Sequence, residues 1–120
     1  MNILLVDDSV CCLTQMVYLI SSTKKLQLLL ATTESKTASE ILNLMFDSID
    51  ILITDIHMPG MDGYELATLA KKLNPKIKVI LVSADNDTKE TIKKSSGMFN
   101  ILIDYEIAKF KIDKLLNALG

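Results

Sequence analysis

Three aspartates directly follow short apolar runs, at positions where carboxylates can take part in chemistry. Asp7 and Asp8 come after the run Ile3–Val6, and Asp55 comes after Ile51–Thr54. If the two runs are neighbouring parallel strands, their carboxyl ends bring the three side chains into one pocket. Two carboxylates about 4 Å apart repel each other by about 4 kcal/mol at an effective dielectric near 20, so the group needs shared protons or a cation. A hard divalent ion with oxygen ligands is the simplest neutraliser, and carboxylates with water suit Mg2+.

A second interpretation of these acids is helix capping. An aspartate at the end of a strand often caps the helix that follows, and Asp8, just before Ser9, could do this alone. Three acids at two strand ends, in a chain without arginine to pair with them, favour the metal pocket over capping.

The apolar pattern predicts the sheet that must position these acids. Short runs with few polar residues recur along the chain at Ile3–Val6, Leu26–Ala31, Ile51–Thr54, Ile77–Val82 and near Phe99–Ile103. Continuous apolarity is typical of strands that are covered on both faces. Segments of helical period separate the runs, with helix starts expected at Ser9, at Ser35 or Thr37, before Tyr64, at Asn86 or Asp87, and before Ile112. The alternation predicts a single α/β domain with an open parallel sheet.

Two motifs resemble the receiver domain of two-component response regulators. The first is Ile-Leu-Leu-Val-Asp-Asp-Ser at 3–9, and the second is Asp-Ile-Leu-Ile-Thr-Asp-Ile-His-Met-Pro-Gly-Met-Asp-Gly-Tyr-Glu-Leu at 50–66. The resemblance covers nearly the whole chain, so residues 1–120 are identified as one receiver domain. It implies a flavodoxin-like fold, with five parallel strands in the order 2-1-3-4-5 and helices on both faces.

The resemblance also implies a role for each acid. Asp55 would accept a phosphoryl group from a phosphohistidine on a histidine kinase or a histidine phosphotransfer domain. Asp8 and Asp55 would bind Mg2+ directly, Asp7 would act largely through water, and the main-chain carbonyl of His57 would complete the protein ligands. Ser83, followed by the small Ala84, stands where receivers carry the switch hydroxyl that bonds the phosphoryl oxygens.

One part of the family pattern is broken. Receivers carry a lysine, usually followed by proline, at the end of the fifth strand, where it pairs with the phosphoryl group. Counting forward from Gly97 puts Asp104 at that position, and Tyr105 follows it instead of proline. Counting back from the last helix puts Lys109 there, at the cost of an insertion of about five residues. Asp104 would weaken phosphate binding by repulsion and Lys109 would strengthen it, and both registers stay open.

Composition excludes several other classes of protein. No apolar run approaches the length of a membrane span, and a net charge of −2 without a basic cluster argues against direct nucleic-acid binding. Cys11 and Cys12 are adjacent and read as free thiols, which predicts a reducing cytoplasm. The output is expected to lie in a downstream protein or in an output domain of a longer chain.

The leading hypothesis is a phosphoacceptor switch that autophosphorylates and autodephosphorylates but does not turn over a free substrate. The broken lysine-proline pattern motivates a second one, a degenerate receiver that binds proteins independently of phosphorylation. A third, an aspartyl-nucleophile phosphohydrolase, would need an acid two residues after the nucleophile, and His57 stands there instead.

Overall fold

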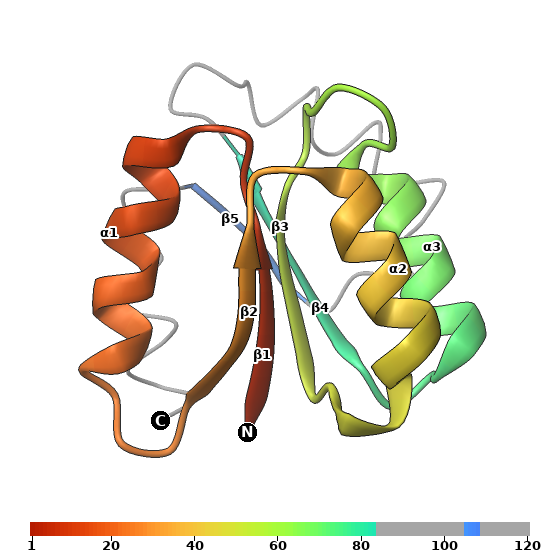
Figure 1. Ribbon diagram of the computed structural model, residues 1–120, viewed down its shortest axis with the longest axis horizontal. Coiled ribbons are helices and arrows are strands. Elements are labelled where there is room, and N and C mark those ends of the chain that lie inside the picture. The colour runs from red at the N-terminus through yellow and green to blue at the C-terminus, as the bar shows by residue number, and fades with distance from the viewer. Residues whose placement is uncertain (84–104, 109–120) are drawn as a thin grey trace.

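A computed structural model describes residues 1–83 and 105–108 of the chain. Its strands are β1 (Asn2–Val6), β2 (Gln27–Thr32), β3 (Ile51–Asp55), β4 (Lys78–Ser83) and β5 (Tyr105–Ala108). They form one parallel sheet in the order β2-β1-β3-β4-β5, so β1 lies between β2 and β3 (Figure 1). The predicted α/β class, the parallel sheet and the order of the first four strands are therefore confirmed.

The position of the last strand differs from the sequence prediction. The run expected near 99–103 lies outside the described residues, and β5 follows it at Tyr105–Ala108. This short segment pairs with β4, with Tyr105 opposite Ile80 and Ala108 opposite Ser83. Main-chain pairing with β4 defines this strand, whereas the sequence prediction rested on apolar content alone.

The helices cover both faces of the sheet (Figure 1). Helix α1 (Val10–Ser21) lies on one face, while α2 (Ser35–Met45) and α3 (Gly63–Leu73) lie on the other. Alternate residues of each central strand serve the two layers: Ile3 and Leu5 pack in the α1 layer, whereas Leu4 and Val6 pack beneath α2 and α3. This division explains why the strands are apolar without alternation.

Local sequence explains where α1 and α3 begin. Ser9 is the N-cap of α1, and its hydroxyl accepts a hydrogen bond from Cys12 N–H at 3.4 Å. Asp62 and Glu65 form a capping box at the start of α3. The second helix ends in a 3-10 turn, η1 (Phe46–Ser48). The two later helices predicted from the sequence lie outside the described residues, and no helix that is described is long and apolar enough to cross a membrane.

Candidate functional site

The three aspartates meet at the carboxyl end of the sheet. Strands β1 and β3 are direct neighbours, with Val6 opposite Thr54, so the residues that follow them lie side by side. One carboxylate oxygen from each of Asp7, Asp8 and Asp55 can be chosen so that all three lie within 4.8 Å of one another. Asp7 is fully buried and Asp55 is 7% exposed, while Asp8 is exposed. The convergence predicted from the sequence is therefore present.

Main-chain N–H groups orient the two buried carboxylates. Ser9 N–H donates to Oδ1 of Asp7 at 2.9 Å, and Ile56 N–H donates to Oδ1 of Asp55 at 2.9 Å. Helix capping does not account for the cluster, because the N-cap of α1 is Ser9 and not Asp8. Two buried carboxylates with oxygens within 4.8 Å of each other lower the stability of the fold unless a positive charge offsets them.

The donor set fits Mg2+ in its chemistry. All three groups offer hard carboxylate oxygens, and the exposure of Asp8 leaves one side of the cluster open to water. Mg2+ is usually held in proteins by one or two carboxylates and keeps several water molecules, so an open, oxygen-rich cluster suits it better than a closed cage would.

The loop between β3 and α3 is built around two glycines. Gly63 N–H donates to the Ile56 carbonyl at 2.8 Å and closes the base of the loop. A Cβ at Gly63 would overlap the carbonyl oxygen of Asp55 and lie 3.0 Å from the Cα of Ile56, so only glycine fits there. Gly60 has φ +80°, a left-handed conformation that glycine adopts without strain. The His57 side chain is exposed.

A hydrogen bond from α2 to this loop was not anticipated from the sequence. The Ser35 hydroxyl donates to the Pro59 carbonyl at 3.0 Å and accepts from Met61 N–H at 3.1 Å. The sequence suggested Ser35 only as a helix start, because a partner 24 residues away leaves no local pattern. Thr54 was also not singled out from the sequence: its buried hydroxyl donates to the carbonyl of the next residue, Asp55, at 2.9 Å.

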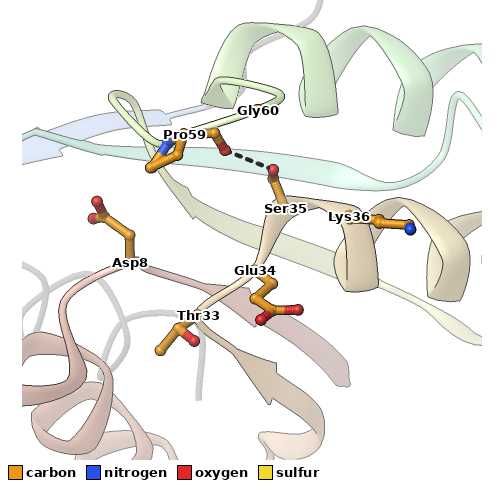
Figure 2. Close-up of a pocket in the computed structure, with 7 residues that line it drawn as sticks. All are labelled: Asp8, Thr33, Glu34, Ser35, Lys36, Pro59 and Gly60. Atoms are coloured by element: carbon orange, nitrogen blue, oxygen red, sulfur yellow. Dashed lines mark hydrogen bonds between the residues drawn. The ribbon is translucent and has the colours of Figure 1, made fainter.

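A solvent-open hollow of about 500 Å³ lies beside Asp8 (Figure 2). Asp8 borders it on one side, and Pro59 and Gly60 of the β3–α3 loop border it on another. The remaining lining residues are Thr33, Glu34, Ser35 and Lys36, at the start of α2. The hollow gives the exposed edge of the cluster an approach from solvent.

The switch residues are described only in part. Ser83 is the last residue of β4 and pairs with Ala108, the last residue of β5, one step beyond the pairing of Asp55 with Val82. Ala84, Asp104 and Lys109 lie outside the described residues.

Comparison with known families settles the class of the chain. Residues 3–118 match the family described as the response regulator receiver domain. The chain belongs to this family. The receiver is 32% identical to the two-component response regulator ORR22 of Oryza sativa subsp. indica over 118 residues, covering 98% of this chain and 16% of that protein. It is 33% identical to the two-component response regulator ARR10 of Arabidopsis thaliana, covering 98% of this chain and 20% of that protein. The receiver thus spans a fifth or less of the length of these relatives.

Solved receiver structures share the fold. The signal receiver domain of an HD domain-containing protein from Pseudomonas fluorescens Pf-5 superposes with a TM-score of 0.78 at 28% identity, covering 98% of this chain and 90% of that one. A response regulator receiver domain protein from Clostridium thermocellum gives a TM-score of 0.79 at 21% identity, covering 98% and 91% of the two chains, which supports the fold alone.

Proposed function

We propose that this receiver is the phosphoacceptor module of a two-component phosphorelay, with Asp55 as the acceptor. The observation that carries the proposal is the cluster itself, in which the buried Asp55 meets Asp7 and Asp8 with carboxylate oxygens within 4.8 Å. The donor would be a phosphohistidine on a histidine kinase or a histidine phosphotransfer domain. The output would be a downstream protein or a domain of a longer chain, as the partial coverage of the relatives allows.

Asp8 and Asp55 would hold Mg2+ directly, the main-chain carbonyl of His57 would add a third ligand, and Asp7 would act largely through water. The exposure of Asp8 supports its role as a direct ligand, because its carboxylate is open to an ion that enters from solvent. When bound, Mg2+ neutralises the charge that accumulates when a phosphoryl group approaches carboxylates.

Asp55 would act as the nucleophile. Its carboxylate oxygen would form a bond to phosphorus as the bond from phosphorus to the imidazole nitrogen of the donor breaks, and the electron pair of that bond would stay on the imidazole. Ile56 N–H fixes the plane of the carboxylate through Oδ1, so the acceptor needs little reorganisation before transfer. The hollow bordered by Asp8 supports an approach for the donor from solvent (Figure 2).

Ser83 and Lys109 would answer the new phosphoryl group. A phosphoaspartate carries additional negative charge and strong acceptor oxygens, which a hydroxyl and an ammonium can bind. Ser83 ends β4 and is followed in the sequence by the small Ala84. The bounds of β5 support Lys109 over Asp104 as the phosphate-pairing residue, because the strand ends at Ala108 and Lys109 is next in the chain, whereas Asp104 precedes it.

The receiver would act as an acceptor with autodephosphorylation rather than as an enzyme that turns over a free substrate. The free thiols of Cys11 and Cys12 support a reducing, cytoplasmic setting for the transfer. The broken lysine-proline pattern keeps a second candidate, a degenerate receiver that binds its partner without phosphorylation, since Phe110 follows Lys109.

Incubation with acetyl phosphate and Mg2+, followed by intact-protein mass spectrometry, tests the proposal. The wild type should gain the mass of one phosphoryl group only when Mg2+ is present, and Asp55→Asn should gain none. Asp47→Asn, a matched change at an exposed residue of η1, should behave as wild type. Absence of any mass gain in the wild type would favour the degenerate receiver.

A further inference from the structure

Ser35 makes a contact that its place in the sequence does not require. It is the first residue of α2 and is 6% exposed. Its hydroxyl donates to the Pro59 carbonyl of the β3–α3 loop (Figure 2) and accepts from the Met61 N–H of the same loop. A buried serine at a helix start commonly caps its own helix. Here the N-cap position is Glu34, which makes no side-chain capping bond, and the Ser35 hydroxyl serves the loop instead.

The loop is shaped to receive this hydroxyl. The two hydrogen bonds flank Gly60, whose φ of +80° turns the chain between them. A Cβ on Gly60 would lie 3.0 Å from the Ser35 Oγ, so a side chain at that position would press on the serine hydroxyl. The contact therefore depends on two residues, a serine on α2 and a glycine in the loop.

Other contacts already hold the two ends of the loop. Gly63 N–H donates to the Ile56 carbonyl at the base, the Asp62–Glu65 capping box fixes the entry into α3, and the Met58 side chain is buried in the core. These contacts hold both ends of the loop without the hydrogen bonds that Ser35 makes to its middle residues, Pro59 and Met61. Loss of the Ser35 hydroxyl should loosen the loop around Gly60 while the sheet and helices keep their packing.

We propose that Ser35 is a positioning residue for the metal site, acting through the β3–α3 loop. The inference rests on the proposed function, in which the His57 main-chain carbonyl is a ligand of Mg2+. His57 lies in the same loop, two residues before Pro59, whose carbonyl accepts from the Ser35 hydroxyl. Loss of that bond would widen the range of positions open to the His57 carbonyl. Groups that orient metal ligands without touching the metal commonly change affinity when they are removed.

Three variants test the inference. Ser35→Ala removes both hydrogen bonds, and Gly60→Ala disturbs the same contact from the loop side. Ser39→Ala is the matched control, because the hydroxyl of this half-buried serine of α2 bonds locally, to the Lys36 carbonyl at 2.8 Å. Mg2+ affinity would be measured by titration monitored by amide NMR, exchange of the Met61 amide hydrogen by NMR, and folding by urea denaturation.

Ser35→Ala and Gly60→Ala should each bind Mg2+ about tenfold more weakly than wild type, at the lower end of such effects. The Met61 amide should exchange faster in Ser35→Ala, and Ser39→Ala should match wild type in both measurements. Ser35→Thr keeps the hydroxyl and should retain most of the Mg2+ affinity of the wild type. This variant separates loss of the hydroxyl from misfolding caused by any substitution at Ser35.

The two possible failures can be told apart. If the wild type and Ser35→Ala bind Mg2+ equally well, Ser35 is not a positioning residue, while the proposed function stands. If Ser35→Thr loses as much affinity as Ser35→Ala, the hydroxyl is not what matters, and the inference is wrong. If the wild type itself binds no Mg2+, the proposed function fails and takes the inference with it.

Discussion

Replacement of Gly63 by alanine tests the close packing between α3 and the acceptor strand. Gly63 is buried at the first position of α3, and a Cβ there would overlap the Asp55 carbonyl oxygen and lie 3.1 Å from Cδ2 of Leu81. Overpacking of this kind typically costs about 1–3 kcal/mol. We expect the upper end of that range, because the main chain at Asp55 and Ile56 cannot swing aside as a side chain would.

Helix propensity acts in the opposite direction. Alanine is favoured over glycine within a helix by about 0.5–1 kcal/mol. Subtracting this gain from a cost of about 3 kcal/mol leaves a net loss of about 2 kcal/mol in the free energy of unfolding. A lower free energy of unfolding would show that overpacking outweighs helix propensity, and a higher one would show the opposite.

Urea denaturation followed by circular dichroism gives the free energy of unfolding. Lys72→Ala, at an exposed position of the same helix, is the control and should stay within about 0.5 kcal/mol of wild type. Gly63→Ala should also accept less phosphate from acetyl phosphate, because relief of the overlap displaces the main chain of Asp55. A variant as stable as wild type, or more stable, would refute the packing argument.

Three further changes probe the charges and the caps. Asp7→Asn keeps an oxygen for the Ser9 N–H and removes one charge from a cluster whose oxygens lie within 4.8 Å of one another. Without Mg2+, urea denaturation should therefore show a free energy of unfolding about 1–2 kcal/mol above that of the wild type. The stabilisation by Mg2+ should be smaller in the variant than in the wild type. Equal Mg2+ stabilisation in both proteins would contradict the metal site. Asp62→Ala removes the capping box of α3 and should cost about 1 kcal/mol in the same assay, and an unchanged stability would show that the box contributes nothing. Lys109→Ala should lower the yield of phosphorylated protein in intact mass spectra while Asp104→Asn leaves it near wild type, and the reverse result would favour the other register.

The convergence of the acids was predictable because it depends on topology. In a parallel sheet the carboxyl ends of neighbouring strands share one edge, so Asp7, Asp8 and Asp55 had to meet once β1 and β3 were adjacent. The alternate packing of the strand residues follows from the two-residue period of a strand in the same way. These features need only the order of strands and the apolar pattern.

Features that depend on distant partners could not be predicted. The Ser35 hydroxyl could have capped α2 equally well by its local pattern, and its partners at Pro59 and Met61 are known only from the folded chain. The start of β5 at Tyr105 was missed because the more apolar run before it gave the stronger signal, although main-chain pairing with β4 defines the strand. Local sequence indicates the propensity of a segment for helix or strand, whereas tertiary packing decides these contacts.

The central claim is that the aspartate cluster is a divalent cation site that serves Asp55. Amide NMR during a Mg2+ titration of the wild type tests it most directly. The account predicts saturable shifts at millimolar Mg2+, concentrated at residues 7–9 and 54–57, and their loss in Asp55→Asn. Spectra that stay unchanged, or shifts spread evenly over the surface, would contradict it.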